Sequence, residues 1–186
     1  MLQFLVFSIT VMLTAAQDYS NPGSCSMAPA PYRAITLIKD SGTVSGTVKI
    51  DQAGAGQPTM YTGTISGLPA NSQHGVHVHY FGDLSNGCTS GGDHFNPLNM
   101  THGGLTDMVR HVGDLGNAVA DANGVITISI TDTVSQLVGS NSVIGRLFVL
   151  HQNMDDLGKG GNATSLANGN SGPRLACGII GYRQNA

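Results

Sequence analysis

The chain has 186 residues, of which 40% are hydrophobic and 10% are charged, with a formal net charge of −3. This composition suits one folded domain with an N-terminal extension and excludes a disordered chain, and the lack of a basic run gives no reason to expect a nucleic-acid partner. Glycine is abundant, at 26 residues, and all 11 acidic residues are Asp, which favours turns over helices and indicates an all-β fold with long loops.

The N-terminus begins with an uncharged apolar run, residues 2–16, that ends in Thr14-Ala15-Ala16. The run is too short to span a bilayer comfortably, and its small final residues suit cleavage by signal peptidase. We therefore expect a signal peptide over 1–16, a flexible segment over 17–32, a domain over 33–186 and a secreted, extracellular protein with no membrane span. Because the run lacks the usual positive charge before it, a buried N-terminal strand or helix stays open.

Export makes disulfides plausible. The cysteines are Cys25, Cys88 and Cys177, and this odd number leaves at least one thiol unpaired or joined to another molecule. Two sequons make Asn99 and Asn162 possible N-glycosylation sites.

After the expected flexible segment over 17–32, β-branched and apolar residues alternate with polar ones, and Gly-rich turns separate the alternating segments. We expect strands over 33–39, 44–51, 59–66, 74–81, 117–120, 124–130, 144–151 and 175–182. No segment shows sustained helical periodicity. Two long Gly- and Asn-rich loops, one running to about 115 and one over 153–173, interrupt the series. About eight short strands with two long loops fit a sandwich or barrel, and loops of this length usually carry function.

Histidine is concentrated in one part of the sequence, since six of the seven fall between 74 and 111. His77 and His79 lie two apart on an expected strand, so both imidazoles point to the same face. Three further histidines and Asp114 follow in the loop, and His151 ends another apolar strand. Imidazole suits copper and zinc, and three His with one carboxylate suit tetrahedral zinc. Spacing alone thus predicts one or two metal ions without naming the chemistry.

Several segments between 33 and 183 agree in order and spacing with one known family: His74-Gly75-Val76-His77-Val78-His79, Phe81-Gly82-Asp83, Gly87-Cys88-Thr89-Ser90, His94-Phe95-Asn96-Pro97, His102-Gly103-Gly104, Arg110-His111-Val112-Gly113-Asp114, Asp155-Asp156-Leu157-Gly158 and Gly172-Pro173-Arg174-Leu175-Ala176-Cys177. In these segments the chain resembles the copper/zinc superoxide dismutases. The resemblance implies an eight-stranded Greek-key β-barrel. It also implies conversion of superoxide to oxygen and hydrogen peroxide by alternating reduction and oxidation of copper.

The resemblance also implies a role for each site residue. One copper per subunit would be bound by His77, His79, His94 and His151, and one zinc by His94, His102, His111 and Asp114. His94 would bridge the two ions and deliver a proton. Arg174 would hold superoxide, Asp155 would link a copper-binding to a zinc-binding histidine, and His74 would be a hydrogen-bonding brace. Cys88 and Cys177 would form a disulfide.

The chain departs from the family in the second loop. Ala163, Thr164, Ala167 and Asn168 stand where the family has acidic residues and a lysine, so we expect a slower enzyme with a weaker dependence on salt. A carrier of copper and zinc, or a defence protein on the same fold with little activity, stays open as the alternative. Gly145, Phe81-Gly82-Asp83 and Ile179-Ile180-Gly181 resemble the family's dimer surface, so we expect a homodimer or larger oligomer, with Cys25 able to link subunits.

Overall fold

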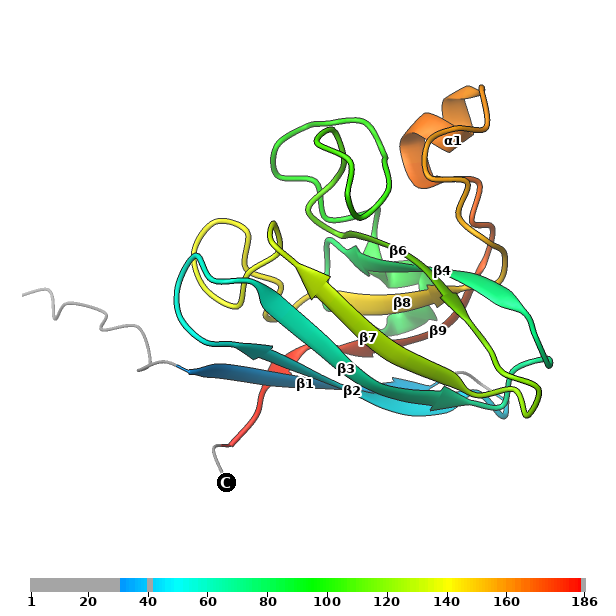
Figure 1. Ribbon diagram of the computed structural model, residues 1–186, viewed down its shortest axis with the longest axis horizontal. Coiled ribbons are helices and arrows are strands. Elements are labelled where there is room, and N and C mark those ends of the chain that lie inside the picture. Colours follow the sequence, from blue (N-terminus) through cyan, green and yellow to red (C-terminus); the bar gives the residue numbers. More distant parts are fainter. Residues whose placement is uncertain (1–30, 40–41, 185–186) are drawn as a thin grey trace, which may run out of the picture.

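The computed structural model describes residues 31–39 and 42–184 (Figure 1). The expected signal peptide over 1–16 and Cys25 lie outside the described residues. Of the expected flexible segment over 17–32, only residues 31 and 32 are described. Strand β1 begins at Tyr32, one residue before the expected start of the domain.

In the described part of the chain, eight antiparallel strands follow one another in a sheet that curls into a nearly closed barrel. In sheet order they are β6 (Asp114–Val119), β4 (Gln73–His79), β8 (Leu147–His151), β9 (Arg174–Ile179), β1 (Tyr32–Lys39), β2 (Ser45–Gln52), β3 (Thr59–Ser66) and β7 (Ile126–Asp132). A single bridge between Ala120 and Ile126 joins the two ends of this order. The short strands β5 (Ser85–Cys88) and β10 (Gly181–Tyr182) lie outside the series, with β10 paired to β1. The expected all-β barrel with two long loops is confirmed.

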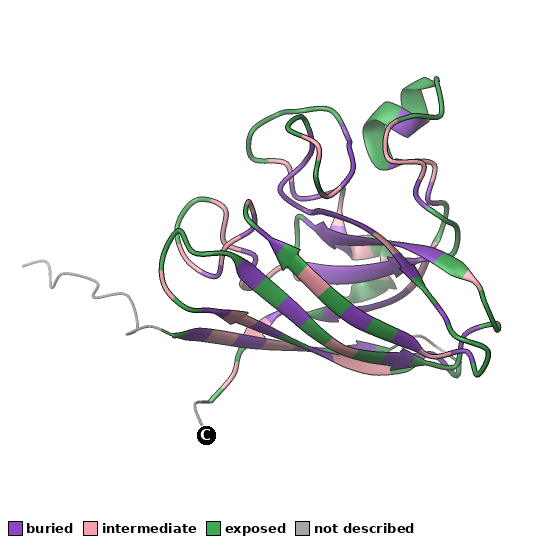
Figure 2. Ribbon diagram, in the orientation of Figure 1, coloured by how far each residue is buried: buried purple, intermediate pink, exposed green. Residues whose placement is uncertain are grey.

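The sheet formed by β1, β2, β3 and β7 follows the alternation in the sequence. On β3, Tyr61 and Ile65 are fully buried, whereas Met60 between Thr59 and Tyr61 is half exposed. Figure 2 shows the same alternating bands of buried and exposed residues along β3 and β7. Gly63 permits close contact with β2, because a Cβ atom there would lie 2.0 Å from the Thr47 carbonyl oxygen. One face of this sheet therefore closes the apolar core while the other faces solvent.

The opposite side of the barrel does not alternate. All five residues of β8 are buried, as are the last six of β4. One face of these strands packs into the core, and the other carries histidines beneath the two long loops. Figure 1 shows both loops on the same side of the barrel, beyond β4, β6 and β8.

Several boundaries differ from the sequence-based expectation. The segment expected over 74–81 ends as a strand at His79, because Tyr80 and Phe81 donate their backbone N–H groups to the carbonyls of Asp93 and Gly91 in the loop. The segment expected over 124–130 forms a strand at Ile126–Asp132. The segment expected over 144–151 begins as a strand only at Leu147, after Gly145 with φ of 74°.

The second loop contains a helix that the sequence reading did not predict. Helix α1 (Ala163–Asn168) begins after Asn162, whose Oδ1 accepts a hydrogen bond from the Ser165 backbone N–H at 2.9 Å. It ends at Gly169, which adopts a left-handed conformation. The helix is too short to show an apolar period, so only its capping residues could have indicated it.

The expected disulfide joins Cys88, at the end of β5, to Cys177 in β9. It connects the first long loop to the barrel across 89 residues of sequence. None of the helices in the described part of the chain has the length and apolar character needed to cross a membrane.

Candidate metal centre

Four histidines from three parts of the chain converge at one point. His77 and His79 come from the same face of β4, His151 ends the neighbouring β8, and His94 lies in the first loop. One ring nitrogen from each lies within 4.8 Å of the others, and all four residues are buried. Strand spacing and strand pairing thus place three of the imidazoles, and the loop supplies the fourth.

The outer nitrogen of three of these rings is held by an acceptor. His79 Nδ1 donates to the Gly92 carbonyl at 2.8 Å, His151 Nδ1 to the Gly172 carbonyl at 3.0 Å, and His77 Nε2 to Asp155 Oδ2 at 2.9 Å. These bonds fix the ring orientations and leave the opposite nitrogens facing inward.

The inward nitrogens form a donor set suited to a metal ion. His79 Nε2 and His151 Nε2 lie 3.1 Å apart. His77 Nδ1 and His94 Nε2 are buried and have no hydrogen-bond partner in the described part of the chain. Buried polar atoms without partners are costly unless something else satisfies them. Four convergent imidazole nitrogens fit a transition-metal ion such as copper or zinc.

A second donor set gathers around Asp114 at the start of β6. Its carboxylate lies 2.8 Å from His94 Nδ1, 3.0 Å from His102 Nδ1 and 3.1 Å from His111 Nδ1. Distance alone also groups His77 with His94, His102 and Asp114. The ring of His77 is oriented by Asp155, however, and its free Nδ1 belongs with the first set, so His111 is the better fourth member. Three imidazoles and one carboxylate fit tetrahedral zinc. His94 belongs to both sets, through Nε2 to the first and Nδ1 to the second.

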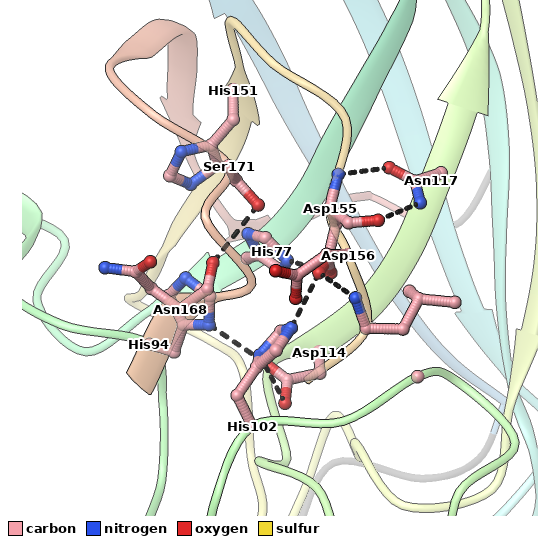
Figure 3. A network of polar contacts seen from close by, with 12 residues as sticks. His77, His94, His102, Asp114, Asn117, His151, Asp155, Asp156, Asn168 and Ser171 are labelled. Atoms are coloured by element: carbon pink, nitrogen blue, oxygen red, sulfur yellow. Dashed lines mark hydrogen bonds and ion pairs between the residues drawn. The ribbon is translucent and has the colours of Figure 1, made fainter. Parts of the chain in front are cut away.

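Asp155 joins the two sets from the second loop (Figure 3). Its Oδ2 accepts from His77 Nε2 at 2.9 Å, and its Oδ1 accepts from His102 Nε2 at 2.8 Å. Asn117 on β6 holds the Asp155 backbone at both ends, with bonds of 2.7 and 2.8 Å. Sequence reasoning assigned no role to Asn117, and nothing in the sequence brings it together with Asp155.

Burial sets the protonation of the first set. Desolvation lowers the pKa of His77, His79 and His94, and it lowers the pKa of His151 to about 4. These imidazoles are therefore neutral near pH 7, as metal coordination requires.

Protonation of the second set follows from its carboxylates. Burial alone would raise the pKa of Asp114, but hydrogen bonds from His102, His111 and His94 outweigh burial and lower it. For His102, burial alone would lower the pKa, because it disfavours the charged imidazolium. Hydrogen bonds to Asp114 and Asp155 outweigh burial and raise the pKa of His102 to about 9. Without metal, the positive charge of His102 therefore offsets the negative charge of the buried Asp114 carboxylate.

A cavity of about 540 Å³ opens onto the first donor set. Its lining comprises His79, Tyr80, Asp93, His94, Asn96, Met100, Thr101, His111, His151, Leu166, Ala167, Asn168, Gly172 and Arg174. The Arg174 guanidinium donates to the carbonyls of Cys88, at 2.6 Å, of Thr89, at 2.7 Å, and of Gly92. Arg174 is thus a fixed cation in the same cavity as His79, His94 and His151.

The other predicted residues lie apart from the two donor sets. His74 braces the end of β8, with Nδ1 donating to the His151 carbonyl at 2.8 Å and Nε2 2.7 Å from Ser72 Oγ. Asn99 and Asn162 are both exposed, on the first loop and before α1.

Comparison with known proteins gives one consistent result. A model of the family described as copper/zinc superoxide dismutase (SODC) matches residues 44–180. Proteins named superoxide dismutase (Cu-Zn) from Candida glabrata and Saccharomyces cerevisiae are 51% and 50% identical to the chain over 149 residues. Each alignment covers 80% of this chain and 97% of the relative. A protein of the same name from Neurospora crassa is 51% identical over 152 residues, covering 82% of this chain and 99% of the relative.

Proposed function

The chain belongs to the copper/zinc superoxide dismutase family and is an enzyme of that class, and from this premise we propose which of its side chains perform the reaction. Two superoxide ions and two protons give one oxygen molecule and one hydrogen peroxide molecule. The observation that carries the assignment is that His94 belongs to both donor sets and shares a cavity with Arg174.

The family's two metals are assigned to the two donor sets. Copper would be held by His77 Nδ1, His79 Nε2, His94 Nε2 and His151 Nε2. Zinc would be held by the Nδ1 atoms of His94, His102 and His111 and by Asp114. When bound, copper supplies alternating one-electron reduction and oxidation, and zinc, which has no redox chemistry, fixes geometry and basicity.

The protein's own groups bind the substrate and manage the proton. Arg174 attracts superoxide and orients it by charge-assisted hydrogen bonds, because its carbonyl partners hold the guanidinium at the cavity wall. His94 lines the cavity and would deliver one of the two protons that peroxide needs. Asp155 keeps the rings of His77 and His102 in position from behind.

The composition of the second loop supports the proposal that this enzyme reacts with superoxide more slowly than family members with a charged loop. Ala163, Thr164, Ala167 and Asn168 carry no charge, and Ala167 and Asn168 line the cavity. Electrostatic steering can raise association rates by about ten- to a thousandfold. With few charged groups at the cavity, the rate should be lower than in a strongly steered enzyme and should change little with added salt.

We also propose that the protein is secreted, with cleavage after Ala16. The apolar run over residues 2–16 supports this proposal, and so does the disulfide between Cys88 and Cys177, a bond favoured in oxidising compartments. N-terminal sequencing of the protein purified from culture medium tests the cleavage. A shift in mass on treatment with a glycosidase, absent in Asn99→Gln or Asn162→Gln, tests each glycan.

A homodimer is proposed through the surface around Gly145. Phe81, Ile179 and Tyr182 are 55%, 41% and 58% exposed. Gly82 lies beside Gly145 and Ile179, since a Cβ atom there would meet both. An exposed cluster of large apolar side chains is typical of an interface. Light scattering should report a dimer, and Phe81→Glu should convert it to a monomer; a wild-type monomer at micromolar concentration would contradict the proposal.

The decisive test measures dismutation by the fully metallated protein, with copper and zinc determined on the same sample. We expect turnover that disappears when copper is removed, and Arg174→Ala should retain both metals while losing most of the rate. Full occupancy with negligible turnover in the wild type would instead favour an exported carrier of copper and zinc.

A further inference from the structure

Asp93 occupies a position in the cavity that the proposed mechanism does not use. It lies between Gly92, whose carbonyl accepts from both His79 Nδ1 and Arg174, and His94. Its own carbonyl accepts from the Tyr80 backbone N–H at 2.8 Å. The backbone of Asp93 is therefore fixed one residue away from the anchor of Arg174 and one residue away from the imidazole common to both donor sets.

The Asp93 carboxylate lines the same cavity as Arg174. Among the lining residues it is the sole acid, and Arg174 is the sole permanent cation. Its side chain is exposed, and it forms no hydrogen bond or ion pair with any residue that the structure describes. The hydrogen bonds of Arg174 go to uncharged carbonyls. Among residues 31–39 and 42–184 neither charge has a direct partner of opposite sign, so both charges contribute to the field in the cavity.

We propose that the Asp93 carboxylate opposes the approach of anions to this site and so limits the rate of the reaction with superoxide. The inference rests on the proposed function, in which the substrate is a small anion that Arg174 attracts. A carboxylate on the wall of the same cavity, carried by a backbone that the bond from Tyr80 holds in place, offsets part of the attraction of one cation before the anion reaches the donor nitrogens.

Two observations support an electrostatic rather than a structural role. Burial lowers the pKa of Arg174, and Asp93 is the charged group that opposes this shift, so the two side chains lie within electrostatic reach. Within the described residues, the carboxylate oxygens also make no hydrogen bond or ion pair whose loss would disturb the loop. Asparagine at this position can therefore remove the charge while leaving the backbone bond to Tyr80 in place.

The experiment compares the metallated wild type with Asp93→Asn, and uses Asp93→Glu and Asp121→Asn as controls. Asp121 is an exposed acid in the turn between β6 and β7, where asparagine can keep the turn bonds to Asn123 and Val125. Pulse radiolysis measures the second-order rate with superoxide across ionic strength. Titration with azide, followed by copper absorbance, measures the affinity of an unreactive anion.

Asp93→Asn should raise the superoxide rate about two- to fivefold at low ionic strength, tighten azide binding by a similar factor and steepen the fall of the rate with salt. Asp93→Glu and Asp121→Asn should stay near the wild type. An unchanged or lower rate and azide affinity in Asp93→Asn would overturn the inference, as would an equal gain in Asp121→Asn. A metallated wild type without turnover would contradict the proposed function instead, while the azide titration would still report on Asp93.

Discussion

The two sides of the barrel bury different chemistry. The sheet of β1, β2, β3 and β7 buries apolar groups such as Ile50 and Ile65, each contributing roughly 1.5–3 kcal/mol. The side formed by β4, β6 and β8 buries His77, His79 and Asp114, whose desolvation costs free energy unless partners or metal ions offset it. One side should therefore be stable by itself, whereas the stability of the other should depend on bound metal.

Removing both metals gives the largest expected effect. Two ions, each at about a thousand times its dissociation constant, together contribute about 8 kcal/mol of folding free energy. Hydrogen exchange measures this effect. In the metal-free protein, the backbone amides of residues 89–113 and 153–173 should lose most of their protection, while those of β1, β2 and β3 should keep most of theirs. Equal loss of protection on both sides would contradict the comparison.

Loss of the disulfide should come next. Replacing Cys88 and Cys177 together by serine releases a loop of 89 residues, which costs roughly 4–5 kcal/mol in the chain-entropy model. Chemical denaturation measures the change. Because the Cys88 carbonyl also anchors Arg174, the superoxide rate should fall even where the variant remains folded.

Asp155→Ala should weaken metal binding by about 10- to 100-fold, because the rings of His77 and His102 lose the carboxylate that orients them. Competition with a chelator measures the affinity. Asp156→Asn is the matched control, since this neighbouring acid accepts from Ser165 and Asn170 instead of from the histidines. If Asp156→Asn weakened binding as much as Asp155→Ala, disorder of the loop would explain both.

A substitution on the apolar side should leave the metals untouched. Tyr61→Phe removes a hydrogen bond of 2.7 Å to Ser135 Oγ and should cost about 1 kcal/mol. Urea denaturation measures this loss, and the affinities for copper and zinc should match the wild type. A change in metal affinity would mean that the two sides are coupled through the core.

The same residue predicts an alkaline loss of stability. Burial raises the pKa of Tyr61 above its ordinary value of 10.0. The folded state therefore retains the neutral phenol, and this preference contributes fully below about pH 10 and is lost as pH rises above it. Tyr61→Phe should flatten the decline in unfolding free energy measured between pH 9 and pH 11.

How far the sequence predicted the structure also differs between the two sides. The expected strand over 59–66 is found at Thr59–Ser66, because alternation on a half-buried strand is visible in the residues themselves. Near the site, His79 ends its strand two residues earlier than expected, because the loop supplies hydrogen-bond partners that no local pattern reveals. Helix α1 was missed because six residues are too few to show a period.

The site itself was predictable to the extent that spacing expresses geometry. His77 and His79 share a face because a strand repeats every two residues. The convergence of His94 and His151 on them required the family resemblance, since no local rule places a loop residue or pairs two strands that are distant in sequence. The support of Asp155 by Asn117 depends on a contact across 38 residues of sequence. The assignment of individual metal ligands stays a prediction.

The anchoring of Arg174 has a consequence for biosynthesis. Its guanidinium bonds carbonyls 82 to 86 residues earlier in the chain, and β9, which carries it, also completes the disulfide. A ribosome makes about 5–20 residues per second, so Arg174 and Cys177 are synthesised several seconds after His77 and His79. Folding dominated by such distant contacts is slow. A nascent chain released before β9 could fold its first strands, but it would have neither the anion-binding cation nor the covalent link that holds the first loop.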